Sequence, residues 1–195
     1  MTTPTAFFEI HVTVAPPSDY ENFRTDCMLL GVKPLRLSLL SRSGAVVMED
    51  YMTSSKHKLA FEGATEACAD IADKLASWGY TVLRKKIETV PWNPMEKEYL
   101  ESHLEVTCYD TESFREFLVP IAIDNNGYIS HNTNKPGVYM LTLRAFDTPF
   151  WVFEDKVEDI RDGLLRQGFE VGDVEIEAAV YDTRYDHDKA WLDAA

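Results

Sequence analysis

A glutamate, a histidine and a threonine alternate with aliphatic residues in the stretch "EIHVTV" near the start of the chain. Successive side chains of a β-strand point to opposite faces, so the aliphatic residues are expected to face a core and the polar residues the other side. The polar set is Glu9, His11 and Thr13. Because an imidazole titrates near neutral pH, His11 is a candidate general acid or base. The alternative is an ordinary strand with a polar outer face.

A similar strand is expected in the second half of the chain, in the stretch "HLEVTCYD" that starts at His103. Its alternation predicts that His103, Glu105 and Thr107 share the polar face, and a register slip of two residues would leave the faces unchanged. The candidate catalytic residues are therefore His11, Thr13 and His103.

Charged residues on neighbouring strands are expected to complete these polar faces. The last strand of the first half places Arg84 and Lys86 beside the first strand, with Lys58 nearby, whereas the second half places Glu175 and Glu177 there. One face is thus predicted to be basic and the other acidic, and we expect the two faces to meet, because large bare sheet faces tend to find a partner. The candidate ligand-binding residues are Arg84, Lys86, Lys58, Glu105 and Thr107.

The elements that carry these residues are duplicated along the chain. "DIADKLASWGYTVLRKKIE" (70–88) aligns without a gap with "DIRDGLLRQGFEVGDVEIE" (159–177). Each copy reads as an apolar helical stripe that is followed by a glycine, Gly79 or Gly168, and then by a strand. The glycines are predicted to end the helices in a left-handed conformation.

Each half reads as β-α-β-β-α-β, which predicts an α+β protein made of two ferredoxin-like lobes with antiparallel sheets. The predicted boundaries are 1–92 for the first lobe, 93–98 for a linker, 99–182 for the second lobe and 183–195 for a C-terminal tail. In the second lobe, the helix that begins at "TESFREFL" is expected to end near Pro120, since proline cannot continue a helix.

The charge is strongly acidic and unevenly distributed. The formal net charge is -14. Residues 1–95 hold 10 basic and 11 acidic residues, whereas residues 96–195 hold 9 and 22. This excess of negative charge argues against direct binding to nucleic acid, which depends on neutralising phosphates. A basic protein surface is the partner that the acidic half favours.

The cysteines and the absence of long apolar stretches indicate the expected compartment. Cys27, Cys68 and Cys108 have unrelated spacings and occupy apolar positions, which predicts buried free thiols in a reducing compartment. No cationic leader and no stretch long enough to span a bilayer is found, so we expect a cytoplasmic protein. No P-loop or dinucleotide fingerprint is present, and no cofactor is expected.

The triplet His11-Val12-Thr13 resembles the His-x-Thr motif of the 2H phosphoesterase superfamily. The resemblance covers this triplet and the two-lobed plan, and it implies a nucleotide phosphodiesterase with histidines as acid and base and threonines on phosphate oxygens. The matching strand of the second half reads "HLEVT" and lacks the motif. The other such triplet is His131-Asn132-Thr133, in a polar stretch.

A second resemblance concerns "HLEVTCYDTESFREFL", in which Asp110 follows His103 by seven residues. This stretch looks like the opening of a vicinal-oxygen-chelate (glyoxalase-like) module, although each predicted half has one strand too few. The resemblance implies a metal-dependent lyase or isomerase with histidine and glutamate ligands from facing modules. The corresponding ligands here are Glu9, His11, His103 and Glu105.

These readings are ranked by how much of the pattern each explains. The leading prediction is a non-catalytic binding or regulatory protein, in which an interlobe cleft takes a small anionic ligand or the acidic half engages a basic protein surface. The phosphodiesterase and the glyoxalase-like enzyme are the alternatives.

Overall fold

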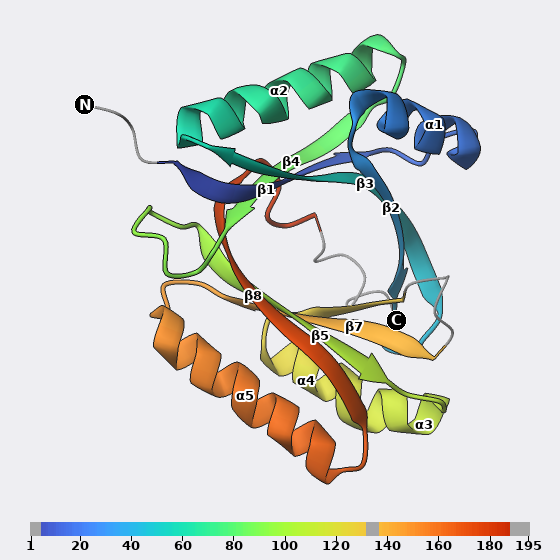
Figure 1. Ribbon diagram of the computed structural model, residues 1–195. Coiled ribbons are helices and arrows are strands. Elements are labelled where there is room, and N and C mark those ends of the chain that lie inside the picture. Colours follow the sequence, from blue (N-terminus) through green and yellow to red (C-terminus); the bar gives the residue numbers. More distant parts are fainter. Residues whose placement is uncertain (1–4, 132–136, 188–195) are drawn as a thin grey trace. The chain divides into compact units, whose positions relative to one another are not determined.

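The computed structural model describes residues 5–131 and 137–187 (Figure 1). The chain divides into two compact units that interleave along the sequence. Unit 1 consists of Met1–Arg36, Asp50–Glu98 and Ala178–His187, and unit 2 consists of Leu37–Glu49, Tyr99–Glu177 and Asp188–Ala195.

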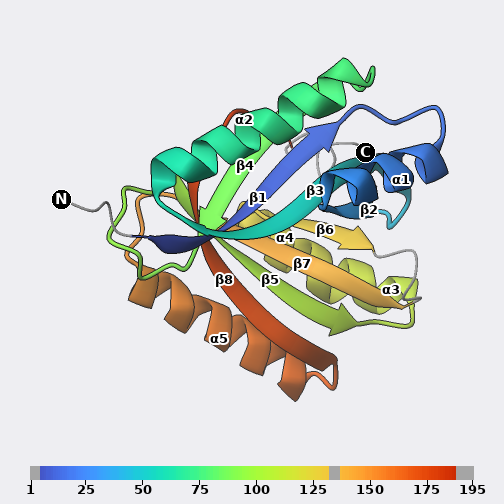
Figure 2. The ribbon, with the colours of Figure 1, turned by 45° about the horizontal axis from the view of Figure 1, so that its top comes forward.

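Unit 1 places two helices against one face of its strands (Figures 1 and 2). The packed face carries the aliphatic residues of the first strand, among them Ile10 and Val12, which are fully buried with Phe23 and Leu75 of the helices. The opposite face carries Glu9 and the other polar residues of that strand. The elements are β1 (Ala6–Val14), α1 (Tyr20–Leu30), the start of β2 (Lys33–Leu40), most of β3 (Val46–Leu59), α2 (Phe61–Ser77) and β4 (Val82–Thr89), with the end of β8 (Glu170–Asp182).

Unit 2 has a more irregular first helix and includes parts of two strands from the first half of the sequence. Its elements are the end of β2, the start of β3, β5 (Tyr99–Thr107), α3 (Thr111–Ser113), η1 (Phe114–Leu118), α4 (Val119–Asp124), β6 (Tyr128–His131), β7 (Val138–Ala145), α5 (Phe150–Arg166) and most of β8. The predicted helix end near Pro120 is wrong. Pro120 lies in the first turn of α4, directly after the π-helical turn η1, where a missing amide hydrogen is tolerated.

The predicted fold class, two ferredoxin-like lobes with open sheets, is also wrong. The hydrogen-bonded strand order closes on itself as an eight-stranded antiparallel barrel, β1-β3-β2-β6-β7-β5-β8-β4. Two ladders that the repeat does not predict account for the closure: Ser38 of β2 pairs with His131 of β6, and Lys86 of β4 pairs with Asp182 of β8. Strands at the edge of an open sheet leave backbone groups unpaired, and these ladders satisfy them.

Local signals in the repeat agree with the structure. Gly79 and Gly168 have φ angles of +94° and +89°, the left-handed conformation predicted for both helix ends. The prediction of buried free cysteines is confirmed for Cys27, Cys68 and Cys108. Burial raises the pKa of the Cys68 thiol to about 11, although Lys85 opposes the shift. Within residues 5–131 and 137–187, no helix combines the length and apolarity that a membrane crossing requires.

Two glycines of unit 2 should respond oppositely to alanine. A Cβ at Gly127 would lie 2.1 Å from the backbone oxygen of Thr142, so Gly127→Ala must displace the backbone of β7 and should cost about 2 kcal/mol or more. A Cβ at Gly163, within α5, meets nothing closer than 3.9 Å, so Gly163→Ala should stabilise by up to roughly 1 kcal/mol through helix propensity. Urea unfolding of both variants checks this pair, and equal effects would contradict the described packing.

Candidate functional site: a repeated histidine–carboxylate cluster

The polar face of unit 1 centres on His11, whose two ring nitrogens have different partners. Nδ1 lies 3.2 Å from the backbone oxygen of Thr53, and Nε2 lies 3.1 Å from Oε2 of Glu88 and 3.7 Å from Oε1 of Glu9. Because a carbonyl oxygen only accepts, the hydrogen bond to Thr53 places a proton on Nδ1. The Nε2 atom faces the Glu88 carboxylate as an ion-pair contact when the ring is protonated. Glu9, His11, Thr53 and Glu88 are called the unit 1 cluster below.

Two lysines neutralise the carboxylates of the unit 1 cluster. Lys86 Nζ lies 2.8 Å from Oε1 of Glu88, and Lys56 Nζ lies 3.1 Å from Oε2 of Glu9. Glu88 is 1% exposed and Lys86 is 8% exposed, so their pairing is sheltered from water. Each carboxylate therefore turns one oxygen to a lysine and the other to His11.

The environment of Glu9 lowers its pKa. Burial raises the pKa of this carboxyl and is the largest single influence. A 2.6 Å hydrogen bond from Ser54 and the positive charges nearby act against burial, and together they bring the pKa of Glu9 below its usual value. Glu9 is thus held ionised in the folded state.

Unit 2 contains a cluster of the same residue types around His103. Nδ1 of His103 lies 3.0 Å from the hydroxyl oxygen of Thr142. Nε2 faces Oε2 of Glu101 at 3.7 Å and Oε2 of Glu177 at 3.8 Å. These distances exceed a hydrogen bond, and no other described residue hydrogen-bonds to Nε2. Glu101, His103, Thr142 and Glu177 are called the unit 2 cluster below.

The two clusters correspond position by position in the duplication. Thr53 matches Thr142 and Glu88 matches Glu177 at the spacing of 89 that relates the helices and closing strands. On the first strands the spacing is 92, so the glutamate and histidine of "EIH" match those of "ESH". Sequence reasoning missed Thr53, Glu101 and Thr142 as members. The shared Glu-x-His triplet was the signal that identifies Glu101.

The clusters differ in the charges that surround them. The position of Lys86 is taken by Glu175 in the second copy, and that of Lys56 by Ala145. In unit 2 the cation is Arg144, whose Nε donates to Oε1 of Glu101 at 2.6 Å. The carboxylates of the unit 1 cluster therefore pair with lysines, whereas Glu101 of the unit 2 cluster pairs with an arginine.

Arg144 pairs with Oε1 of Glu101, whereas His103 faces Oε2 of the same carboxylate. Its guanidinium carbon lies 5.1 Å from the ring centre of Tyr99 and 4.9 Å from that of Tyr128. The Tyr128 hydroxyl also donates to Oε1 of Glu101 at 3.1 Å. Cation–π contacts hold Arg144, and hydrogen bonds from Arg144 and Tyr128 hold Oε1 of Glu101.

The other predicted residues of unit 1 do not form a cationic surface. Arg84 lies opposite Thr13 in the strand ladder, and its guanidinium pairs with Asp182 through contacts of 2.9 and 2.5 Å. Lys58 lies over the ring of Phe7, 5.3 Å from its centre. Thr13 is buried.

In unit 2, the predicted residues beyond His103 lie farther along β5. Glu105 lies beside the backbone of Gly172, and Thr107 pairs with Val138 at the strand end. The ring of His131 lies 5.5 Å from that of Tyr139. Asn132 and Thr133 of the second His-x-Thr triplet lie outside the described residues.

Comparisons with known proteins add no family. No family model matches the chain, and no curated protein matches it. A solved structure described as an unknown protein from Galdieria sulphuraria aligns over 89% of this chain and 98% of its own, with 13% sequence identity and a TM-score of 0.29.

Removing the buried lysine of unit 1 should destabilise the protein. Lys86→Met leaves the Glu88 carboxylate with only part of its compensation, and breaking a buried ion pair costs about 3–5 kcal/mol. Lys85→Met, on the neighbouring and half-exposed position, should change the free energy of unfolding by less than about 0.5 kcal/mol. Urea denaturation compares the two, and a loss in Lys86→Met no greater than in the control would refute the pairing.

Glu9 should contribute to the acid limb of the stability curve. Since its pKa is lower in the folded chain, its contribution is fully present above about pH 4.5 and is lost as the pH falls through the folded-state value. Glu9→Gln should therefore lower the free energy of unfolding at pH 7 and flatten its decline toward pH 3, measured by denaturant unfolding across that range. The exposed Glu62→Gln serves as the control. A Glu9→Gln curve that parallels the wild type would contradict the assignment.

Proposed function

We propose that this protein is a non-catalytic binding protein whose unit 2 cluster takes a divalent metal ion. The observation that carries the proposal is the geometry of His103. Its Nδ1 is engaged by Thr142, while its Nε2 points toward two carboxylates without a hydrogen-bond partner among the described residues. An imidazole nitrogen flanked by carboxylate oxygens is a donor set for zinc and similar divalent ions.

The outer contacts of the cluster also fit a metal site. Histidines that ligate metals usually donate their second ring N–H to an oxygen, which fixes the tautomer and the ring orientation. Thr142 supplies that oxygen for His103, and the Arg144–Tyr128 pair holds Glu101. Neighbouring ligands in a tetrahedral zinc shell lie about 3.4 Å apart. The oxygens of Glu101 and Glu177 lie 3.7 and 3.8 Å from Nε2 of His103, and these distances would shorten when the residues bind one ion.

Electrostatics favour unit 2 over unit 1 for this role. In unit 1 the ammonium groups of Lys56 and Lys86 already neutralise both carboxylates, so a divalent ion would add unbalanced positive charge. In unit 2 the guanidinium of Arg144 pairs with Glu101, and Glu175 stands at the sequence position that corresponds to Lys86. The replacement of a basic by an acidic residue favours a cation in this unit.

The enzymatic alternatives receive less support. A general acid or base must present a nitrogen to its substrate, and both ring nitrogens of His11 already have protein partners. The phosphodiesterase reading also expects a second His-x-Thr, but the residue two positions after His103 is Glu105, whose charge disfavours phosphate. The predicted binding of a small anionic ligand also receives less support, because the side chains of Lys86 and Arg84 pair with carboxylates of the protein.

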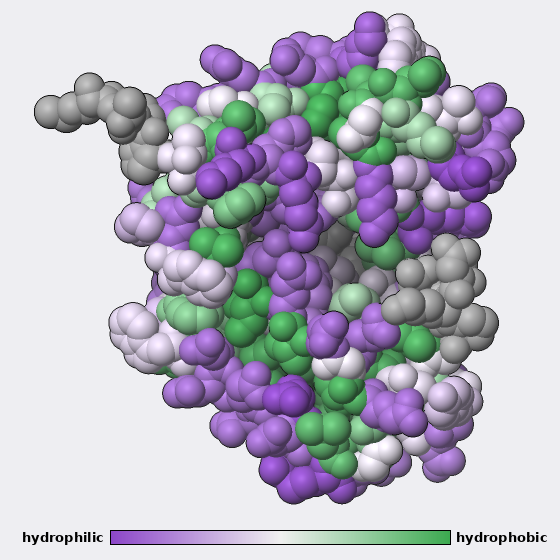
Figure 3. Space-filling model, viewed as in Figure 1, coloured by the Kyte–Doolittle hydropathy of each residue, from purple (hydrophilic) through white to green (hydrophobic). Residues whose placement is uncertain are grey.

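Binding of a basic protein is a second candidate function, and the surface of α5 favours it. Mainly hydrophilic side chains cover this helix (Figure 3). The exposed acidic residues of unit 2 on α5 and β8 are Glu154, Asp155, Glu158, Asp159, Asp162, Glu170, Asp173 and Glu175. Such a surface attracts cationic partners in a salt-dependent manner.

Calorimetric titration with Zn²⁺ and Mn²⁺ tests the metal site. Wild type should bind one ion tightly, and His103→Ala should abolish that binding. Thr142→Val, which removes only the outer hydrogen bond, should weaken it roughly 10–100-fold. Affinity should fall at acidic pH, because protons compete for the ligands.

The corresponding variant of unit 1 is the matched control. His11→Ala should keep the stoichiometry and affinity of the wild type, provided that circular dichroism shows both histidine variants to be folded. A wild type that ignores both ions, or a folded His103→Ala that binds them normally, would refute the proposal.

A further inference from the structure

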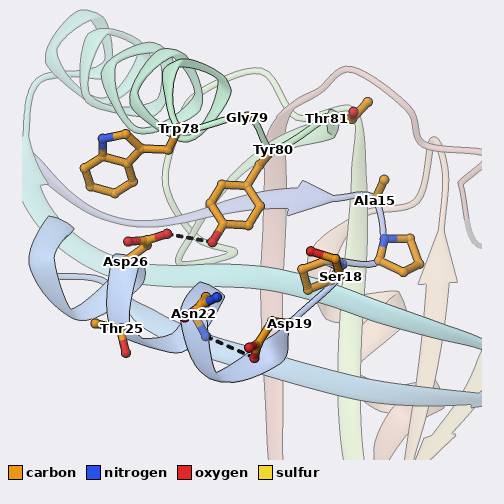
Figure 4. Close-up of a pocket in the computed structure, with 12 residues that line it drawn as sticks. Ala15, Ser18, Asp19, Asn22, Thr25, Asp26, Trp78, Gly79, Tyr80 and Thr81 are labelled. Carbon is orange, nitrogen blue, oxygen red and sulfur yellow. Dashed lines mark hydrogen bonds between the residues drawn. The ribbon is translucent and has the colours of Figure 1, made fainter.

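Unit 1 has a pocket of about 430 Å³ whose lining includes no residue of the unit 1 cluster (Figure 4). It lies between the segment that leads from β1 into α1 and the turn that leads from α2 into β4. Its volume is within the range of small-molecule sites. The lining residues include two carboxylates, Asp19 and Asp26, and two aromatic side chains, Trp78 and Tyr80.

Both carboxylates have one oxygen engaged by the protein and one oxygen left over. Oδ2 of Asp26 accepts a 2.6 Å hydrogen bond from the Tyr80 hydroxyl. Oδ1 of Asp19 accepts from the backbone amides of Glu21 and Asn22, at 2.8 and 3.4 Å, as the N-cap of α1. The second oxygen of each has no hydrogen-bond partner among the described residues. The pocket lining contains no lysine, arginine or histidine to neutralise them.

The Tyr80 ring lies beside the Asp26 carboxylate and packs against the hydrophobic core. The Tyr80 ring packs edge-on against the buried ring of Phe23, with centres 5.4 Å apart. Burial and the adjacent Asp26 raise the pKa of Tyr80, so its hydroxyl stays protonated and continues to donate. Figure 4 shows the Tyr80 hydroxyl directed at Asp26, with the Trp78 ring alongside.

The Trp78 ring makes a cation–π contact with a lysine of the same helix region. Lys74 Nζ lies 5.4 Å from its centre, the distance of a cation–π contact, and Lys74 is not a lining residue of the pocket. Gly79, whose φ is +94°, lies in the turn between Trp78 and Tyr80. Two unneutralised carboxylate oxygens and aromatic rings around one cavity are the chemistry that recognises an organic cation.

We infer that this pocket binds a small organic cation, namely a protonated primary amine or a guanidinium group. The carboxylates of Asp19 and Asp26 supply the charge and accept its N–H groups, and the rings of Trp78 and Tyr80 pack on its carbon stem. The site is built entirely from unit 1 and is independent of the metal proposed for unit 2. A free amine and the side chain of a peptide lysine or arginine present the same group.

Titration with defined probes tests the inference on the full chain. Butylammonium and ethylguanidinium should bind and change the tryptophan fluorescence, whereas neutral butanol of similar shape should not. N-acetyl-lysine amide distinguishes the two sources: binding as tight as that of butylammonium indicates a peptide side chain, and much weaker binding indicates a free amine.

Two isosteric variants separate charge from folding. Asp26→Asn keeps an acceptor for Tyr80, and Asp19→Asn keeps a good N-cap, so both should fold. Each should weaken the binding of both cations roughly tenfold or more, because a hydrogen bond to a charged group is lost. The exposed Asp70→Asn on α2 is the matched control and should bind as the wild type does. Wild-type affinity in the folded Asp19→Asn/Asp26→Asn double variant, equal binding of butanol, or no binding of either cation would overturn the inference.

Discussion

Buried carboxylates on the polar strand faces impose the constraint on which the rest of the structure depends. Glu88 and Glu101 are 1% and 0% exposed, and an ionised group that leaves water must find opposite charge or hydrogen-bond donors. Glu88 meets Lys86 and His11, whereas Glu101 meets Arg144, which is held between aromatic rings. The composition of both polar faces follows from this requirement.

The repeated sequence pattern places the same residue types around a histidine in both units, with different charged neighbours. Each unit has a histidine whose Nε2 faces two glutamates. Its Nδ1 hydrogen-bonds to a threonine, through the backbone oxygen of Thr53 in unit 1 and the hydroxyl of Thr142 in unit 2. The first copy closes its cluster with lysines, and the second replaces Lys86 with Glu175. This difference in charge is the basis for the proposal that the unit 2 cluster binds a cation. Glu175 and Glu177 belong to the acidic excess of the second half of the chain.

Much of this was accessible from the sequence, because local signals repeat. The offset of 89 aligned Glu88 with Glu177, and strand alternation correctly separated Ile10 and Val12 from the polar face. The glycine caps followed from the same alignment. What failed was long-range pairing: closure through the β2–β6 and β4–β8 ladders depends on edge strands whose partners no local pattern specifies. Arg84 and Lys86 were read as ligand-binding cations, since sequence does not reveal that Asp182 and Glu88 would pair with them.

The central claim is that Lys86 neutralises a carboxylate of the unit 1 cluster, and that the unit 2 cluster, with Glu175 at the corresponding position, can bind a metal ion instead. The most direct test introduces a lysine at the corresponding position of unit 2. The Zn²⁺ affinities of the Glu175→Lys and Glu175→Gln variants are compared with that of the wild type. We predict that the folded lysine variant loses the ion while the glutamine variant binds it nearly as the wild type does. Equal affinity in all three proteins would contradict the account.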